Sequence, residues 1–319
     1  MSQTPTALGR IDIHRHVSPP FYQDAIKGVY PKPFPPLLAT WTPERCLEDM
    51  DAGGIELGVL SMPARPGVYF GDVAGSRKFC REINEYMAGL RRAHSGRFGM
   101  FAALPLPDIE GSIAELAYAL DVLKAEGVGT LTSYGNKYLG DPSFAPLWSE
   151  LDRRGAIVFT HPTDSECCPN PVPQMHETVV EFGADTARTI GSLVFSGTSA
   201  RFPHIRFVFS HGGGSMPFAI DRFINQSRVP ETAALLPNGV EYELRRFYYD
   251  TAFASSPVAM AALTKLVPCS QIVLGTDFPY NAGATTVAAL NACGVAPSDI
   301  AAILRENSLA LLQGRAKAV

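Results

Sequence analysis

Eight short apolar runs, each followed by a loop and then by a stretch with helical spacing, place the strongest constraint on the fold of this chain. The runs span residues 10–14, 55–62, 97–104, 127–133, 156–161, 205–211, 247–251 and 271–277. They are continuous rather than alternating, which is typical of strands buried on both faces of a parallel sheet. No linker rich in Gly, Ser or Pro divides the 319 residues. We therefore expect one α/β domain over residues 1–319, folded as a single closed (β/α)8 TIM barrel rather than as a doubly wound sheet.

Helix signals stand between the runs. Thr42 can cap a helix, Pro43 suits its first turn, and the glycine pair at 53–54 can end it. A second helix is expected over residues 112–127.

Two long segments, 17–41 and 162–176, each follow the end of an expected strand. We expect both as loops over the mouth of the barrel, where they could shape or cover a pocket. The second contains two adjacent cysteines, Cys167 and Cys168, which we interpret as apolar loop packing.

The C-terminal tips of the expected strands carry the residues best suited to chemistry. These residues are His14, His16, His161, His211 and Asp277. In a closed parallel barrel the tips meet at one mouth, although the residues are up to roughly 260 positions apart in sequence. Alternate residues of a strand point to the same side, so both histidines of the first run can project inward, with Arg15 directed away or toward a loop.

Three imidazoles and one carboxylate form the ligand set that borderline divalent ions prefer, with a position left for water or substrate. We therefore predict one divalent ion, with Zn2+ favoured and Mn2+ also compatible. The predicted ligands are His14, His16, His161 and Asp277. A single strand-end histidine is more often a hydrogen-bonded core residue, so the prediction depends on the four residues together. By contrast, His94 and His204 precede strands and are expected to be solvated on the opposite face of the barrel.

Bulk composition narrows the class of partner. The net charge is −4, the pI is near 6.0 and no basic run stands out, so nucleic acid is not an expected partner. No signal-peptide pattern opens the chain, and no stretch approaches the roughly 20 apolar residues of a membrane helix. We expect a cytoplasmic protein with a small-molecule partner and no membrane contact. The six cysteines form neither a CxxC set nor a disulfide framework, so free thiols are expected.

Longer segments around these residues are similar to one known family. The segments are IDIHRH, FGDVAGSRKFCREINEY, GRFGMFAALPLPD, LTSYGNKYLGDPSFAPLWSELDRRGAIVFTHPT, LVFSGTSARFPHIRFVFSHGGGSMPFAIDR and LGTDFPY. Together they resemble the metal-dependent decarboxylases of the amidohydrolase superfamily, in the aminocarboxymuconate-semialdehyde decarboxylase branch and nearest to 6-methylsalicylate decarboxylase-like proteins. The resemblance covers nearly the whole chain. It implies a TIM barrel with its active site at the C-terminal ends of the strands.

The resemblance also implies roles for individual residues. It assigns the same four ligands to one divalent ion, and it implies that His211 does acid or base work beside the metal. An arginine in the position of Arg222 reaches the neighbouring subunit's site in this family, which implies a homodimer.

The implied reaction is the non-oxidative removal of CO2 from an ortho-hydroxy aromatic acid such as 6-methylsalicylate, which gives 3-methylphenol. We expect Asp277 to deliver the proton to the ring carbon and His211 to hydrogen-bond to the substrate or to Asp277, while the reverse assignment stays open. No lysine stands at the tip of the fourth run, and Lys137 is expected to be a surface charge. A single ion is therefore favoured over the two bridged ions that many hydrolases of the superfamily use.

Two other functions stay open at this point. A metal-dependent hydrolase of a lactone or an amide would use the same ligands, with the ion's bound water as nucleophile. A barrel without catalysis, kept as a binding module, is the second. Other hydroxybenzoates, a carboxyuracil and a muconate semialdehyde follow 6-methylsalicylate as expected substrates.

Substrate contacts are predicted near the mouth. Arg65 and Arg222 are the candidates for the substrate carboxylate, with surface salt bridges as the alternative. Phe21, Tyr69 and Phe278 are the candidates for the aromatic ring, with ordinary packing as the alternative.

Overall fold

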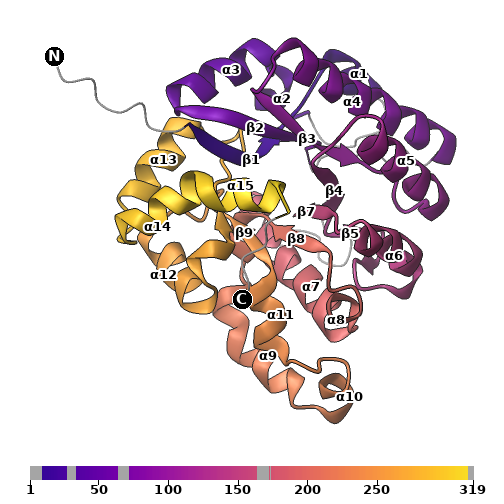
Figure 1. The fold of residues 1–319 in the computed structure, drawn as a ribbon, viewed down its shortest axis with the longest axis vertical. Helices are drawn as coiled ribbons and strands as arrows, with labels where there is room; N and C mark the ends of the chain where they lie inside the picture. Colours follow the sequence, from indigo (N-terminus) through magenta and orange to yellow (C-terminus); the bar gives the residue numbers. More distant parts are fainter. Residues whose placement is uncertain (1–8, 27–33, 64–71, 164–171, 173, 315–319) are drawn as a thin grey trace.

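The computed structural model describes residues 9–26, 34–63, 72–163, 172 and 174–314, which form a barrel of eight parallel strands (Figure 1). The strands follow one another in the order β1 (Arg10–His16), β2 (Ile55–Ser61), β3 (Phe98–Ala103), β4 (Gly127–Leu131), β7 (Ile157–His161), β8 (Arg206–Phe209), β9 (Tyr248–Asp250) and β10 (Ile272–Val273). Hydrogen bonds close the ring between β1 and the segment after β10: Ile13 N donates to Leu274 O and Asp277 N donates to His14 O, each at 2.9 Å. The predicted TIM barrel is confirmed.

The eighth strand is shorter than its apolar run. Only Ile272 and Val273 pair with β9. Beyond them Leu274 N donates to Ile303 O at 3.1 Å, and Asp277 has a positive φ of 67°. A left-handed backbone cannot continue a strand, so the segment 274–278 follows β1 as an irregular chain.

Helices surround the strands (Figure 1). They are α1 (Pro20–Ile26), α2 (Pro36–Ala39), α3 (Pro43–Ala52), α4 (Val73–Ala93), α5 (Ile109–Asp121), α6 (Ala145–Arg153), α7 (Glu181–Phe195), α8 (Thr198–Arg201), α9 (Ile220–Ser227), α10 (Pro230–Ala233), α11 (Val240–Arg246), α12 (Pro257–Leu266), α13 (Gly283–Asn291), α14 (Pro297–Ala301) and α15 (Asn307–Leu312). Within the described residues, none of these helices is both long and apolar enough to cross a membrane.

The local helix signals are partly confirmed. Thr42 Oγ1 accepts a hydrogen bond from Arg45 N at 3.2 Å, and Gly53 caps the other end of α3. The helix predicted over 112–127 is α5, which begins earlier because Asp108 caps it by accepting from Gly111 N, and which ends earlier, at Asp121.

The segment 17–41 differs from the loop that we expected. Its described part contains α1 and α2, each of which begins at a proline, where the fixed φ of the ring suits a first helical turn. Tyr22 and Leu38 are buried, so these short helices pack onto the barrel. A two-stranded hairpin, β5 (Ser133–Tyr134) with β6 (Lys137–Tyr138), follows β4.

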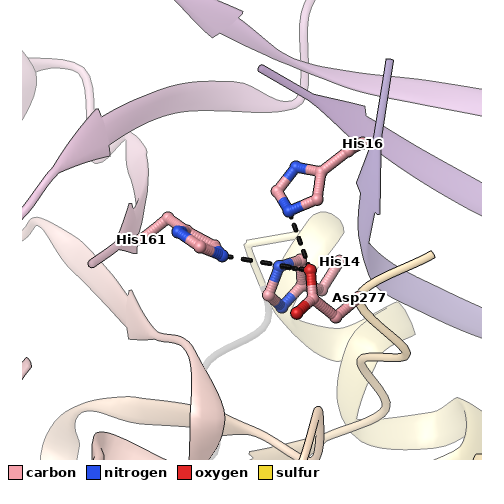
Figure 2. A group of neighbouring side chains, drawn as sticks. All are labelled: His14, His16, His161 and Asp277. Atoms are coloured by element: carbon pink, nitrogen blue, oxygen red, sulfur yellow. Dashed lines mark ion pairs between the residues drawn. The ribbon is translucent and has the colours of Figure 1, made fainter. Parts of the chain in front are cut away.

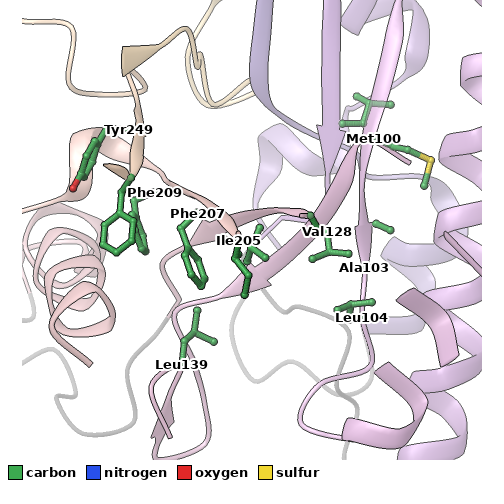
Figure 3. Close-up of a cluster of buried hydrophobic side chains, with 14 of the residues drawn as sticks. Met100, Ala103, Leu104, Val128, Leu139, Ile205, Phe207, Phe209 and Tyr249 are labelled. Atoms are coloured by element: carbon green, nitrogen blue, oxygen red, sulfur yellow. The ribbon is translucent and has the colours of Figure 1, made fainter. Parts of the chain in front are cut away.

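Two apolar clusters hold the strands in place. The inner cluster consists of Ile11, Ile13, Val59, Phe101, Ile157, Phe159, Val208, Tyr248, Val273 and Leu311. The outer cluster includes Met100, Phe207 and Phe209 (Figure 3). Neighbouring residues of one strand belong to different clusters, as strands buried on both faces require. Each large side chain buried in this way contributes about 1.5–3 kcal/mol.

Candidate metal centre

A β-bulge in β1 turns the histidine pair inward. The pairing of β1 with β2 shifts by one residue between Asp12 and Arg15. Ile13 belongs to the inner apolar cluster, and the adjacent His14 also points inward, with its ring centroid 4.9 Å from that of Phe159. Simple alternation would send one of these two neighbours outward. Because of the bulge, Ile13 and the predicted ligand His14 can both point into the barrel although they are adjacent in sequence.

The four predicted ligands meet at the mouth of the barrel (Figure 2). The Oδ1 atom of Asp277 lies 2.8 Å from His16 Nε2, 3.2 Å from His14 Nε2 and 3.9 Å from His161 Nε2. One ligand atom from each residue lies within 4.8 Å of all the others, and all four residues are buried. Residues from β1, β7 and the segment after β10 thus form one cluster.

The donor atoms of this cluster fit a divalent ion. The Nε2 atoms of His14, His16 and His161 and the Oδ1 atom of Asp277 are buried and have no hydrogen-bond partner among the described residues. Buried polar atoms are rarely left in this state without an ion or water to satisfy them. The Nδ1 atoms of His14 and His161 are already engaged, at 2.7 Å by Asp250 and at 2.8 Å by the carbonyl of the next residue, so both rings present Nε2. Three imidazole nitrogens and one carboxylate oxygen form a metal-binding site.

Asp250, which orients His14, was not among the residues predicted from the sequence. This buried residue ends β9, and its Oδ1 accepts from His211 N at 2.8 Å and from Ala252 N at 3.0 Å. A Cβ at Gly275 would lie 2.8 Å from Asp250 Cβ, so only glycine there allows the segment to pass this carboxylate. A signal was present, since an aspartate at the tip of the seventh run is a polar residue at the mouth.

His211 lies beside the predicted ligands without belonging to them. Its Nε2 is 3.3 Å from Asp277 Oδ2, and its ring centroid is 5.0 Å from that of His161. Both His211 and Asp277 have left-handed backbones, with φ of 56° and 67°. Such conformations are uncommon outside glycine and occur mainly where surrounding structure enforces them, often at functional sites.

Charge coupling sets the protonation of the site. Burial would lower the pKa of His14, but the carboxylates of Asp250 and Asp277 outweigh burial and raise it to about 10. Burial would raise the pKa of Asp277, but the charge of His14 and the close imidazoles of His16 and His211 hold it well below its usual range. Burial lowers the pKa of His161 well below its usual value, and the nearby imidazoles lower it further. A neutral His161 and an ionised Asp277 are the protonation states that a metal ion needs.

Two of the predicted ring contacts have neighbours in the described structure, which does not test their contact with a substrate. The ring of Phe21 contacts those of Phe79 and Tyr86 on α4, with centroids 5.9 and 5.6 Å apart. The ring of Phe278 lies 4.4 Å from the guanidinium carbon of Arg15.

For the other residues that the sequence singled out, the described structure gives no contact with the metal centre. Arg222 is exposed on α9. Arg65, Tyr69, Cys167 and Cys168 lie outside the described residues, as do parts of the segments 17–41 and 162–176. Lys137 lies on β6, where its Nζ is 3.9 Å from Asp141, and His204 is exposed and bonded to Asp152.

Other aromatic side chains surround the histidines. The ring centroids lie 5.9 Å apart for Phe182 and His161, 6.1 Å for Phe253 and His211, and 6.0 Å for Tyr280 and His16. Phe182 and Phe253 were not predicted from the sequence, because α7 and the turn after β9 carry no motif that marks them.

A small cavity of about 30 Å³ opens beside His161, at the ends of β2, β3 and β4. Its walls include Met62, Phe101 and Leu104. With such walls the cavity suits an apolar group better than a charged one.

Known proteins resemble the chain in sequence. A decarboxylase of Aspergillus niger, yanB, is 35% identical over 287 residues, which covers 86% of this chain and 78% of that protein. A 6-methylsalicylic acid decarboxylase of Penicillium expansum is 32% identical over 280 residues, which covers 85% of each chain.

Solved structures share the fold. An amidohydrolase II structure superposes with a TM-score of 0.87 at 26% identity and covers 96% of this chain and 100% of its own. A dihydroxybenzoic acid decarboxylase from Polaromonas sp. JS666, solved with bound manganese, has a TM-score of 0.78 at 20% identity and covers 97% of this chain and 98% of its own. The family model described as amidohydrolase matches residues 11–314. The chain therefore belongs to the amidohydrolase family.

Proposed function

We propose that this protein is a metal-dependent, non-oxidative decarboxylase of an ortho-hydroxy aromatic acid, with 6-methylsalicylate as the leading substrate. The observation that carries the proposal is the convergence of three imidazoles on Asp277, with His211 Nε2 3.3 Å from the other oxygen of the same carboxylate. Relatives that are 35% and 32% identical and carry the name decarboxylase support the reaction type.

The reaction breaks the bond between the ring carbon and the carboxylate. A proton first adds to this ring carbon; the bond to the carboxylate then breaks, CO2 leaves, and the electron pair of that bond returns to the ring, so that 6-methylsalicylate gives 3-methylphenol. The difficult step is protonation of this carbon, because it interrupts the aromatic system. A divalent ion bound by the four ligands would chelate the carboxylate and the adjacent phenolate, orient the ring and offset their charge.

Asp277 and His211 are the proposed proton carriers. Asp277 is ionised in the free site, so the proton that it delivers has to reach it first. His211 Nε2 is close enough to Asp277 Oδ2 to pass that proton or to hold it in place.

The cavity beside His161 supports an alkyl-substituted ring. Its volume of about 30 Å³ is too small for a benzene ring but leaves room for a methyl group. Phe253 lies beside His211 and Tyr280 lies edge-on to His16, so both can contact the aromatic ring of the substrate. Phe21, Tyr69, Phe278 and Arg65 stay predicted contacts.

For the metal, we propose Zn2+, with Mn2+ as the alternative. Three imidazole ligands favour Zn2+, whereas a related decarboxylase was solved with manganese. Loading the metal-free protein with each ion and comparing turnover decides between them.

We further propose a homodimer in which Arg222 serves the neighbouring subunit's site; a cytoplasmic location also stays a prediction. Arg222 is exposed on α9 and therefore available to a second copy. Mixing inactive Arg222→Ala and Asp277→Asn proteins tests this arrangement. In a mixed two-fold dimer one site is intact, so activity should return to about a quarter of the wild-type value. No recovery after subunit exchange would contradict a shared site.

The direct test is incubation of metal-loaded protein with 6-methylsalicylate. We expect release of CO2 and formation of 3-methylphenol, measured by chromatography, with metal-free protein as the control. A hydrolase of the same fold would leave the acid untouched and cleave a lactone or amide. Asp277→Asn protein that still binds metal should lose turnover by about 10²- to 10⁴-fold. Full turnover in that variant would assign the proton to another residue.

A further inference from the structure

A buried arginine lies directly behind the ligand segments. Arg15 stands between the two histidines of β1, but its fully buried side chain packs outward against α3. Each of its five N–H groups has an acceptor. Nε donates to Cys46 Sγ at 3.4 Å; Nη1 donates to Asp12 Oδ2 at 2.9 Å and to Thr276 Oγ1 at 3.4 Å; and Nη2 donates to Asp49 Oδ2 at 2.7 Å and to Cys46 O at 3.3 Å. A planar guanidinium with every donor engaged fixes the groups around it.

Asp12 continues this network to the segment that carries Asp277. Its Oδ1 accepts from His14 N at 3.0 Å and from Thr276 N at 3.1 Å, and its Oδ2 accepts from Thr276 Oγ1 at 2.6 Å. The backbone N of the residue after Asp277 donates to the same Thr276 hydroxyl at 3.3 Å. Both sides of Asp277 are therefore tied to β1 through groups that Arg15 contacts.

The surrounding helices hold the other arm of Arg15. Asp49 on α3 also accepts from Gly283 N, the first residue of α13, at 3.0 Å. On β2, a Cβ at Gly58 would lie 2.7 Å from Arg15 Cδ, so the glycine leaves the space that the arginine fills. The network joins β1, α3, α13 and the 274–278 segment at one point.

We propose that Arg15 is a positioning residue for the metal centre, which holds Asp277 against the His14 and His16 imidazoles through Asp12 and Thr276. Asp277 needs such support because its left-handed φ of 67° is not a conformation that an aspartate keeps without constraint from its surroundings. The inference rests on the ligand cluster and not on the identity of the substrate. An inactive protein in the 6-methylsalicylate assay would therefore leave it intact.

Metal affinity is the first test. Zn2+ is titrated into metal-free wild-type, Arg15→Lys and Thr276→Val proteins in competition with a chelator, at a temperature far below the unfolding midpoint of each. Partners that orient metal ligands typically contribute 10- to 100-fold to affinity. We expect a loss in this range for Arg15→Lys, which keeps the charge but not the planar fork, and about tenfold for Thr276→Val, which removes only the hydroxyl.

Arg206→Met is the matched control. Arg206 begins β8 at the opposite end of the barrel, where it donates to Gly155 O at 2.7 Å and to the carbonyl of Leu311. Its loss should lower the thermal midpoint and leave Zn2+ affinity within about twofold of wild type. Equal losses of affinity in Arg206→Met and Arg15→Lys would show a general effect of lost packing and overturn the proposal.

The visible spectrum of Co2+-loaded protein gives a readout of coordination itself. A displaced Asp277 changes the ligand field, so Arg15→Lys and Thr276→Val should alter band position or intensity, while Arg206→Met should match wild type. If Arg15→Lys fails to fold, Thr276→Val tests the proposal on its own. Wild-type affinity and a wild-type spectrum in a folded Thr276→Val protein would overturn the proposal.

Discussion

The two halves of the metal centre are built differently. On the side of β1 and the 274–278 segment, His14 and Asp277 are fixed by two buried carboxylates and by the network of Arg15. On the side of β7 and β8, His161 is oriented by a hydrogen bond to its own neighbour's carbonyl, and His211 stands in a glycine-rich turn with a positive φ. Side chains from several elements thus hold the first half, whereas the His161 ring is bonded to one backbone carbonyl and the His211 ring to Asp277.

We expect the partners that support the first half, Asp12, Asp250 and Arg15, to affect metal affinity, and His211 in the second half to affect turnover without affecting affinity. This division follows from the contacts. The carboxylate partners act on ligand geometry, but His211 contacts Asp277 through the oxygen that faces away from the shared ligand position. Three substitutions and one measurement of proton release test the contrast between the halves.

The largest effect should come from His211→Asn. Loss of an acid or base group lowers the rate by about 10²- to 10⁴-fold. We expect kcat for 6-methylsalicylate to fall in this range while Zn2+ affinity stays within about threefold of wild type. Chelator competition and product chromatography measure the two quantities. A large loss of affinity would make His211 part of the ligand set.

Asp250→Asn should weaken metal binding by about 10- to 100-fold. The new amide keeps an oxygen for His211 N but presents its NH2 group to His14 Nδ1. That imidazole then carries its proton on Nε2, the atom needed for the ion. Isothermal titration with Zn2+ measures the loss. Unchanged affinity would mean that the tautomer of His14 does not matter.

Metal uptake should release about one proton at neutral pH. The raised pKa of His14, about 10, means that the ring is protonated in the metal-free site, and Nε2 must lose its proton before an ion binds. Affinity should therefore fall by up to about tenfold for each pH unit below this pKa. Titrations of Zn2+ in buffers with different ionisation enthalpies count the protons. No release at pH 7 would contradict the coupling of His14 to Asp250 and Asp277.

The smallest effect on the centre should come from Gly58→Ala. The added Cβ would press on Arg15, and overpacking of this kind lowers the free energy of unfolding by about 1–3 kcal/mol. We expect only a several-fold loss of Zn2+ affinity. Gly129→Ala on β4 is the control, because its nearest atoms lie at 3.9 Å, and its unfolding free energy in urea should change by less than about 0.5 kcal/mol. Equal losses of unfolding free energy in the two variants would contradict the claim that Arg15 needs the space beside Gly58.

Continuous apolar runs with polar residues at their ends predicted the barrel and the four ligands. Both predictions depend on patterns that each strand carries within its own sequence. His14 and His16 were correctly expected to meet His161 and Asp277. The β-bulge that turns His14 inward beside Ile13 could not be predicted, since it depends on the pairing of β1 with β2.

Contacts that join distant segments were out of reach for the same reason. Arg15 was expected to point away from the interior of the barrel or toward a loop, and it does point outward, but its buried acceptors on α3 and the 274–278 segment could not be predicted. Asp250 is a polar residue at a strand end, but its contact with His14 depends on the fold, which places the end of β9 against that histidine. The ring of Phe21 likewise contacts α4, which no local pattern reveals.

Anomalous diffraction from crystals of Zn2+-loaded protein, recorded at the zinc edge, tests the central claim most directly. The account predicts one peak, about 2.0–2.2 Å from the Nε2 atoms of His14, His16 and His161 and from an oxygen of Asp277. A peak held by other residues, or no peak from protein that decarboxylates 6-methylsalicylate, would contradict it.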